Sequence, residues 1–350
     1  MEHVKDIINK FQIPIKKYSY EPISNGLIND TYLVSSDRNP LYILQKINTE
    51  VFQNTEALFQ NLDLVLPSLD ASNYQKVELL ATNTGKNYYK TASKEVWRLM
   101  TYIKDSQVFN TTENVNIAFE AGKIITNFHS LLVDFDIHLL ADTLPNFHNL
   151  QFRHEQFLTA LKNAKTEKIK EAKKAIRFVE ENITVFLEMP MDNLPVRVCH
   201  NDTKLNNILF SKHNKALCLI DLDTLMRGSF LYDFGDAART IVNTAREDEI
   251  ELDKINFNQH LFESFISGIA IHSQFLTVKE KELLPLSVGL MPFLHGIRAL
   301  TDYLENNKYY KVKYANQNLD RANSLFAFSK IALENSTFMQ NCIREKLDKF

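Results

Sequence analysis

Residue types that build loops and cross-links are scarce in this 350-residue chain, which has 8 glycines, 9 prolines and 3 cysteines. The low glycine and proline content excludes a fibrous or low-complexity protein and predicts long helices with few elaborate loops. Cys199, Cys218 and Cys342 are too few and too scattered for a disulfide framework or a zinc site. We interpret Cys199 and Cys218 as small buried hydrophobic residues.

Long apolar runs and an excess of one charge are also lacking. No run approaches the length of a membrane span, and the polar N-terminus predicts no signal peptide. The formal net charge of -3 creates no basic field, so we expect neither nucleic acid nor a membrane as partner. The longest basic run, 162–177, is interleaved with acids at helical spacing and predicts a solvated helix face. We expect a cytoplasmic protein, and the sequence leaves its oligomeric state open.

The hydrophobic pattern changes from strand-like to helical near residue 104. Before that point we predict a helix over 54–66 and strands over 18–22, 31–34, 41–45, 75–81 and 95–103. After it we predict helices over 115–132, 155–182, 248–271, 279–304 and 319–347. The pattern therefore predicts an α+β fold of two lobes, with a small antiparallel sheet in 1–103 and mainly helices in 104–350.

One stretch interrupts the helical half with a different pattern. A polar loop, 199–207, leads into a short apolar strand, a turn at 211–215 and a second apolar strand that ends in Asp221 and Asp223. Two strands joined by such a turn are typical of a hairpin. The hairpin would bring Asp221 close to Asn207, with Asp202 just ahead of it. This grouping suits a Mg²⁺-nucleotide site with a general base beside it.

The spacing of these residues narrows the chemistry. His200, Asp202 and Asn207 follow the pattern His-x-Asp-x-x-x-x-Asn, which is the spacing of a kinase catalytic loop. Phosphoryl transfer needs a metal to neutralise phosphate oxygens, a positioned acceptor and a carboxylate to take the acceptor's proton. We assign the last role to Asp202 and predict metal ligation by Asn207 and Asp221. An ordinary surface loop would explain neither the spacing nor the paired acids.

The same residues carry a family resemblance. The motifs around Asp202 and Asp221 resemble the aminoglycoside phosphotransferase and choline kinase family, whose members are relatives of protein kinases. Further segments, 26–32, 42–48, 222–224, 232–237 and 298–304, resemble its N-acetylhexosamine 1-kinase branch. The similarity covers about residues 15–315. It implies a protein-kinase-like fold and the transfer of phosphate from ATP, with Mg²⁺, to the anomeric hydroxyl of N-acetylglucosamine or N-acetylgalactosamine.

The resemblance also assigns nucleotide-binding residues. The segment 26–31 would cover the phosphates. It has a single glycine, Gly26, so the donors would be backbone N–H groups and the side chains of Ser24, Asn25, Asn29 and Thr31. Strand 41–46 should supply the group that contacts the α and β phosphates, and either Gln45 or Lys46 could fill that position. The segment 98–102 resembles an interlobe hinge, where the backbone near Met100 and Tyr102 would read adenine. Glu56 could pair with Lys46 or be an exposed helix acid.

Three acids after the hairpin strand leave alternatives open. Asp223 is expected either to assist a second metal or to position the loop. Asp233-Phe234-Gly235 spells the metal-binding triplet of protein kinases, but it lies twelve residues beyond Asp221. In the family it resembles, the metal ligand ends the hairpin strand. We therefore expect Asp233 and Asp236 to brace the catalytic loop or to cap a helix that starts near Ala237.

For the acceptor the sequence offers candidates only. Asp202 and the helical half provide the expected contacts, namely Arg298, His148, Arg153 and Tyr303. A buried Arg298 needs either an acid partner or a polar ligand, and a structural ion pair would explain His148 and Arg153 equally well. We interpret His200 and His129 as packing and hydrogen-bonding groups.

These observations favour an ATP-dependent N-acetylhexosamine 1-kinase. A kinase of the same fold for another sugar, choline, homoserine or an aminoglycoside is the first alternative, and the mixed or basic segment 298–313 argues against cationic aminoglycosides. A nucleotide-binding pseudokinase that serves as an interaction module is the second alternative. The presence of Asp202, Asn207 and Asp221 together argues against it.

Overall fold

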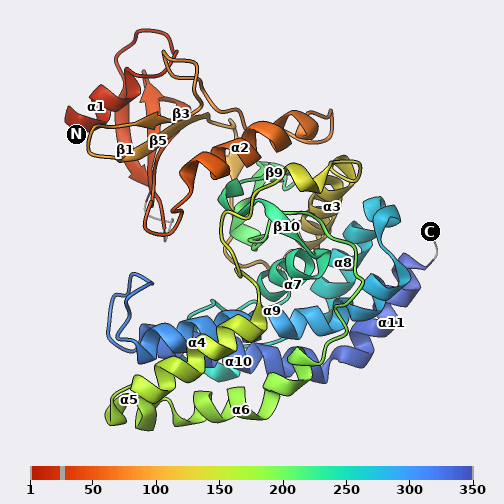
Figure 1. Cartoon of the computed structure of the whole chain (residues 1–350). Coiled ribbons are helices and arrows are strands. Elements are labelled where there is room, and N and C mark those ends of the chain that lie inside the picture. Colours follow the sequence, from red (N-terminus) through yellow and green to blue (C-terminus); the bar gives the residue numbers. More distant parts are fainter. Residues whose placement is uncertain (1, 24–27, 349–350) are drawn as a thin grey trace.

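A five-stranded antiparallel sheet forms most of the first lobe (Figure 1). The computed structural model describes residues 2–23 and 28–348. The strand order is β1-β2-β3-β5-β4, and the strands are β1 (Ser19–Ile23), β2 (Asp30–Ser36), β3 (Asn39–Ile47), β4 (Tyr89–Lys90) and β5 (Val96–Thr101). The strands predicted near 18–22, 31–34, 41–45 and 95–103 are confirmed, so the alternation of apolar residues was sufficient to find them.

The strand predicted over 75–81 is wrong. Gln75 donates its N–H to Leu217 O in the other lobe at 2.9 Å, so the segment starts away from the sheet. It reaches β5 only through an isolated bridge between Leu79 and Met100, where the Leu80 N–H donates to Leu99 O at 2.8 Å and the Thr101 N–H donates to Glu78 O at 3.0 Å. Strand β4 pairs with the other end of β5, at Val96 and Trp97. A long-range contact thus overrides the local strand pattern.

An unpredicted helix, α1 (Glu2–Ile8), covers one face of the sheet. Val4, Ile7 and Ile8 of this helix pack on Trp97 and Leu99 in a small core that belongs to the first lobe. The helix has only 7 residues, and helices of that length depend on tertiary packing rather than on their own propensity.

The predicted helix over 54–66 is confirmed as α2 (Thr55–Val65), which continues as the 3₁₀ turn η1 (Leu66–Leu69). Asn54 caps it by accepting the Ala57 N–H at 3.1 Å. Asn61 donates to Ala141 O at 2.8 Å and to Leu225 O at 2.9 Å, both in the second lobe. Because Leu58 and Leu62 belong to the large core of the helical lobe, α2 fixes the two lobes to each other.

The helical lobe contains more and shorter helices than predicted. The expected helix over 155–182 is three helices, with one break at the extended residues Ala164 and Lys165 and a second at Ala172. The one expected over 319–347 is two helices that meet at Asn335. Of the expected helix over 248–271, only 259–269 is α-helical. The α-helices are α3 (Val115–Leu131), α4 (Leu150–Asn163), α5 (Thr166–Glu171), α6 (Lys173–Leu187), α7 (Phe230–Ile241), α8 (Gln259–Ile269), α9 (Val278–Leu304), α10 (Gln317–Glu334) and α11 (Ser336–Leu347).

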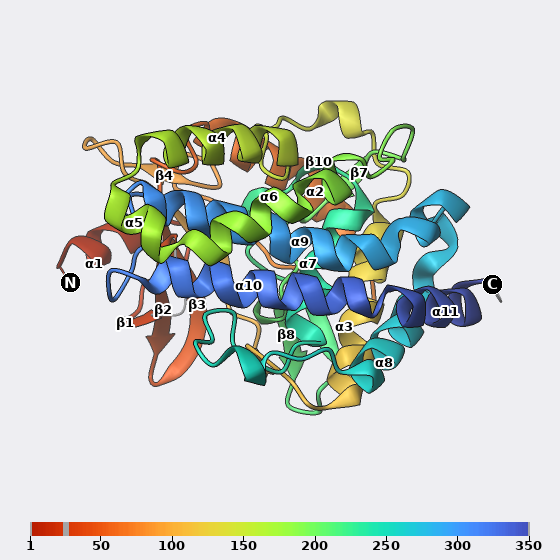
Figure 2. The ribbon, with the colours of Figure 1, turned by 90° about the horizontal axis from the view of Figure 1, so that it is seen from below.

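Helix α9 is the central helix of this lobe and runs beside α10 (Figure 2). By length and composition alone it could cross a membrane, so the expectation that no segment approaches a membrane span is corrected. In its most apolar window, however, 83% of the residues are buried inside the protein. Burial of that extent is typical of the core helix of a globular domain.

The predicted hairpin is confirmed as β8 (Ile208–Ser211) and β9 (Ala216–Leu219), with Ile208 opposite Leu219. A short strand, β6 (Ser106–Gln107), adds to its edge. Two further short strands, β7 (Arg197–Cys199) and β10 (Met226–Gly228), pair antiparallel on either side of the hairpin in sequence. Together they hold the loop 200–207 and the segment 220–225 next to each other.

Candidate active site

The loop that carries Asp202 is fixed by a buried carboxylate, that of Asp233 in α7. Asp233 Oδ2 accepts the backbone N–H of His200 at 2.9 Å and Oδ1 accepts that of Asn201 at 2.7 Å. His129 Nε2 lies 2.9 Å from Oδ2, and Thr203 Oγ1 donates to the Asp233 carbonyl at 2.5 Å. Asp233 therefore braces the catalytic loop, as the first alternative predicted. Ser229, not an aspartate, caps α7, which begins at Phe230 and not near Ala237.

His129, Cys199 and Asp233 lie close enough to suggest a metal site. The carboxylate oxygens of Asp233 already accept the hydrogen bonds described above. Burial raises the pKa of the Cys199 thiol well above its ordinary value, so the thiol stays protonated and is a poor metal ligand. The cluster is a hydrogen-bonded support for the loop, and the interpretation of His129 as a satisfied core residue is confirmed.

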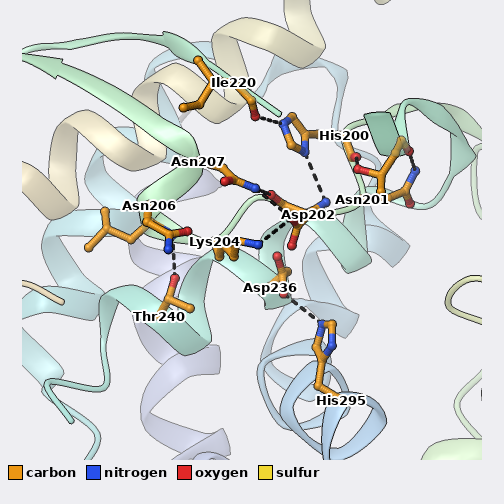
Figure 3. Close-up of polar contacts among 12 residues, drawn as sticks. His200, Asn201, Asp202, Lys204, Asn206, Asn207, Ile220, Asp236, Thr240 and His295 are labelled. Carbon is orange, nitrogen blue, oxygen red and sulfur yellow. Dashed lines mark hydrogen bonds and ion pairs between the residues drawn. The ribbon is translucent and has the colours of Figure 1, made fainter. Parts of the chain in front are cut away.

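His200 supports the loop from the opposite side. Its Nδ1 accepts the Asp202 N–H at 3.2 Å, and its Nε2 lies 2.9 Å from the Ile220 carbonyl (Figure 3). This pattern requires the tautomer that is protonated on Nε2. The ring links the base of the hairpin to the loop, which confirms its predicted role as a packing and hydrogen-bonding residue.

Asp202 lies at the centre of a charged group that the loop presents (Figure 3). Asn207 Nδ2 donates to both the carbonyl and Oδ2 of Asp202 at 2.8 Å, so the predicted base and the predicted metal ligand are in contact. Lys204 Nζ lies 2.8 Å from Asp202 Oδ2. Burial alone would raise the pKa of Asp202, but the Lys204 charge outweighs it and holds the pKa below its ordinary value. The carboxylate is thus ionised at neutral pH and able to accept a proton.

Lys204 belongs to this group of side chains, although it was not among the residues predicted from the sequence. It lies two positions after Asp202, inside the spacing motif, and a cation at that position was the available signal. Burial lowers the pKa of Lys204, but the carboxylates of Asp202 and Asp221 raise it by more, so its pKa lies above the ordinary value and the ammonium is charged. It is a cation placed among acids where phosphate oxygens would need one.

Asp221 directly follows the hairpin strand, as predicted. The Ile220 N–H donates to the Asn207 carbonyl at 2.8 Å, which sets Asp221 beside Asn207. Asp221 has φ 61°, in the left-handed region, and it is exposed. The surrounding protein still limits its hydration, and this desolvation together with the Asp223 charge raises the pKa of Asp221 to about 6.

The donor set fits a divalent cation. Asp221 and Asn207 offer a carboxylate oxygen and an amide oxygen, which are the ligand types that Mg²⁺ prefers. Limited hydration, and after it the charges of Asp223 and Asp202, raise the pKa of Asp221, and a bound cation would offset both effects.

Asp223 is engaged by the protein on both oxygens. Asn29 Nδ2 donates to its Oδ2 at 2.7 Å, and the Arg98 guanidinium pairs with its Oδ1 in a site where both side chains are only 2% exposed. These contacts favour the positioning alternative for Asp223. Its assignment to a second metal stays a prediction.

Arg98 links the sheet to this group of acids. Its Nε and Nη2 donate to Gln45 Oε1 at 2.9 and 2.6 Å, and Gln45 in turn donates to Thr31 Oγ1 at 3.0 Å. The predicted nucleotide residues Asn29, Thr31 and Gln45 are therefore joined in one network that ends at Asp223.

Lys46 lies outside that network. Its Nζ pairs with Glu95 at 2.5 Å and lies over the Trp97 ring, whereas Glu56 is exposed. Because neighbouring residues of a strand point to opposite faces, Gln45 and Lys46 cannot both face Asp223. The contacts favour Gln45 for the phosphate side.

The remaining predicted nucleotide residues fall into two groups. Met100 pairs with Ile43 near the end of β5, and the Tyr102 N–H donates to Leu41 O at 2.9 Å. Both residues therefore lie where the chain leaves the sheet for the helical lobe. Ser24, Asn25 and Gly26 lie outside the described residues.

A pocket of about 900 Å³ lies between α4, α9 and the segments 142–147 and 305–310. Arg153 and Arg298 both line it. Arg298 stacks on the Phe147 ring at 4.8 Å, and Arg153 donates to the Phe147 carbonyl at 3.1 and 3.3 Å. Burial and the neighbouring Arg298 lower the pKa of Arg153 to about 10. Within the described part of the chain, neither arginine forms an ion pair with an acid, so the structural ion pair considered for Arg153 is not found.

The three other predicted acceptor residues, Asp202, His148 and Tyr303, are not in the lining of this pocket. His148 is buried, with Nε2 2.9 Å from the Asn201 carbonyl, so it connects the pocket segment to the catalytic loop. Tyr303 is 1% exposed and donates its hydroxyl to Glu171 at 2.5 Å in α5. Their substrate contacts stay predictions.

A sheet lobe joined to a helical lobe, with a base, an amide and a carboxylate gathered on one loop and hairpin, defines a phosphotransferase of the protein-kinase-like fold. The sequence profile of the phosphotransferase enzyme family matches residues 19–259. This match spans more than half of the chain, and the chain therefore belongs to that family.

Solved structures show the same fold over nearly the whole chain. The chain is similar to a microcompartment-associated aminopropanol kinase, with a TM-score of 0.61, 15% identity and coverage of 97% of this chain and 98% of that one. It is also similar to a choline/ethanolamine kinase family protein from Mesorhizobium loti, with a TM-score of 0.61, 15% identity and coverage of 99% of this chain and 100% of that one. A third similar structure is amicoumacin kinase in complex with AMP-PNP and Ca²⁺, with a TM-score of 0.60, 11% identity and coverage of 95% of this chain and 93% of that one.

Replacing Asp202 with Asn should lower kcat by about 10²–10⁴-fold, because the amide cannot accept the proton of the acceptor hydroxyl. ATP affinity should be retained, since the predicted metal ligands Asn207 and Asp221 remain. A coupled ADP-release assay measures the rate, and calorimetric titration with Mg-ATP measures the affinity. Asp134→Asn, at an exposed site, is the matched control. Near-normal turnover of Asp202→Asn would remove Asp202 as the base.

Two buried histidines should make the protein less stable in acid. Burial lowers the pKa of His148 to about 3 and that of His295 to about 4. Below pH 6.5 both histidines bind a proton in the unfolded chain but not in the folded protein. Each histidine therefore lowers the free energy of unfolding by about 1.4 kcal/mol for every unit by which the pH falls. Urea unfolding at pH 6.0 and 5.0 measures the slope.

His148→Gln should reduce this slope by about 1.4 kcal/mol per pH unit. His213→Gln, which removes an exposed histidine, should leave it unchanged. Equal slopes for wild type and His148→Gln would contradict the exclusion of a proton from His148.

Proposed function

We propose that this phosphotransferase is an ATP- and Mg²⁺-dependent small-molecule kinase that phosphorylates the anomeric hydroxyl of N-acetylhexosamines, N-acetylglucosamine or N-acetylgalactosamine. The observation that carries the choice of acceptor is the pocket of Arg153 and Arg298, whose guanidinium groups form no ion pair in the described part of the chain, whereas each of its five lining acids is either exposed or already hydrogen-bonded. His148 connects the pocket segment 142–147 to the loop that carries Asp202. The resemblance of the motifs over residues 15–315 to the N-acetylhexosamine 1-kinase branch supports the same choice.

Each side chain of the site has a separate role in an in-line phosphoryl transfer. Asp202 accepts the proton of the attacking hydroxyl, and Lys204 keeps that carboxylate ionised until the acceptor arrives. Asn207 and Asp221 would hold Mg²⁺, which supplies positive charge to the phosphate oxygens. The network of Arg98, Gln45 and Thr31 fixes the sheet edge over which the nucleotide would bind. Catalysis then rests on positioning and electrostatics.

The charges in the pocket discriminate between acceptor classes. Asp142 is paired with Arg227 at 2.7 Å, and Asp302 accepts the N–H groups of Tyr309 and Tyr310 at 2.8 and 3.0 Å. The other lining acids, Glu50, Glu155 and Glu305, are exposed. A cationic acceptor would therefore meet two guanidinium groups without an available buried acid. Neutral sugars suit the arginines, which donate hydrogen bonds, and the tyrosine rings, which can pack on a sugar face.

The alternatives differ in what they require of the same residues. Phosphorylation of choline, homoserine or an aminoglycoside would need a group that neutralises the acceptor's ammonium. The pocket disfavours these acceptors, because it offers no available buried acid. Another neutral sugar would fit the same charges and is the stronger alternative. A pseudokinase needs no intact base, and the contact of Asp202 with Asn207 and Lys204 argues against that role.

An ATP-consumption panel over N-acetylhexosamines, plain hexoses, choline and aminoglycosides tests this function. We expect the highest kcat/KM for an N-acetylhexosamine, and phosphorus NMR should show a sugar 1-phosphate. Asp202→Asn is the control for contaminating kinases. A phosphate on another oxygen, or preference for a cationic acceptor, would reject the acceptor assignment and leave the kinase activity standing. Absence of turnover with every acceptor would favour the pseudokinase.

A further inference from the structure

Asp236 in α7 is a buried carboxylate that the protein satisfies on one side only. It is 0% exposed, and its Oδ1 accepts Arg239 Nε at 2.8 Å and lies 3.1 Å from His295 Nε2. Its Oδ2 is buried and has no hydrogen-bond partner among the described residues. Burial of a charged oxygen without a partner is unfavourable, so such an atom in a folded protein calls for an explanation.

The free oxygen faces the reacting groups. Figure 3 shows that one Asp236 oxygen reaches His295 while the other points toward Asp202 and Lys204. Lys204 forms its hydrogen bond with Asp202 Oδ2 at 2.8 Å and forms none with Asp236 Oδ2 in this arrangement. Burial would raise the pKa of Asp236, but Arg239 and His295 hold it below its ordinary value, so the oxygen is an ionised acceptor.

Other unsatisfied atoms lie on the same side of the catalytic loop. Thr143 Oγ1 and His148 Nδ1 are likewise buried without a partner in the described ranges. Thr143 lines the 900 Å³ pocket, and the His148 ring lies 6.1 Å from that of His295, the partner of Asp236. The unsatisfied groups thus extend from the pocket to the base. That arrangement is expected where a polar ligand completes the hydrogen bonds.

We propose that Asp236 binds the phosphoryl acceptor, with Oδ2 accepting a hydrogen bond from the donor on the carbon next to the reacting hydroxyl. This inference rests on the proposed function, in which that donor is the acetamido N–H on the carbon beside the anomeric one. Asp202 takes the proton of the reacting hydroxyl, and the neighbouring Asp236 oxygen holds the adjacent donor. The pair orients the sugar so that only the anomeric oxygen can attack.

The proposal predicts a selectivity that a supporting role for Asp236 would not produce. Wild-type kcat/KM should fall roughly 10²-fold from an N-acetylhexosamine to the 2-deoxyhexose, and similarly to the N-methylated acetamide, because both lack the N–H. Asp236→Asn should lower kcat/KM for the N-acetylhexosamine about as much while leaving the 2-deoxy sugar nearly unaffected. The preference would then shrink to within a few-fold.

His295→Gln is the matched control, since it disturbs the same buried group from the Oδ1 side and keeps Oδ2. It should retain the wild-type preference for the N–H donor. Circular dichroism and thermal unfolding check that both variants fold, and the wild-type series with the two analogues decides the question if Asp236→Asn does not.

Equal losses of Asp236→Asn on all acceptors would overturn the proposal and indicate that Oδ2 binds an ordered water. So would wild-type rates within threefold for the N-acetylhexosamine and its two analogues. If the wild-type enzyme prefers an acceptor other than an N-acetylhexosamine, the proposed function has failed by itself. The inference about Asp236 is then decided with that acceptor and its analogue lacking the donor next to the reacting hydroxyl.

Discussion

The active site depends on two hydrogen bonds that one buried carboxylate accepts from consecutive backbone N–H groups. Asp233 accepts the N–H groups of His200 and Asn201 and so fixes the chain just before Asp202. Asn201 has φ 63°, a left-handed conformation that a free loop would rarely keep. The carboxylate compensates for that conformation with two charge-assisted hydrogen bonds. The predicted metal ligand Asn207 is held separately, because its N–H donates to Lys204 O and its carbonyl accepts the Ile220 N–H from the hairpin, both at 2.8 Å.

A second buried charge connects this loop to the other lobe. The Arg98 guanidinium joins Asp223, close to the predicted metal ligand Asp221, to Gln45 and through it to Thr31 in the sheet. Helix α2 adds an uncharged connection, because Asn61 bonds two carbonyls of the helical lobe. Buried contacts of both kinds thus connect the strands predicted to bind the nucleotide to the loop that carries Asp202. Such preorganisation is what phosphoryl transfer requires, because the reaction gains most from fixed charges and fixed distances.

Local patterns in the sequence were sufficient for the hairpin, the helix 54–66 and the grouping of Asp202, Asn207 and Asp221, because spacing and turn residues encode them directly. They were insufficient where distant contacts decide. The pairing of Arg98 with Asp223 joins residues 125 positions apart, and the local sequence pattern around Arg98 does not predict it. Helix α1 exists because it packs on Trp97 and Leu99. The helix break at Ala164 and Lys165 falls on residues that ordinarily favour helix, so tertiary packing must impose it.

We infer that the Asp233 carboxylate positions the loop of Asp202 without touching substrate or metal. This role can be tested by measuring turnover and nucleotide binding of Asp233→Asn. The amide can accept only one of the two backbone N–H groups, so the account predicts a fall in kcat of about 10²-fold or more. Mg-ATP affinity should stay within a few-fold, and thermal unfolding should still show a cooperative transition. Near-wild-type turnover would contradict the account, and so would a selective loss of metal affinity, which would make Asp233 a metal ligand after all.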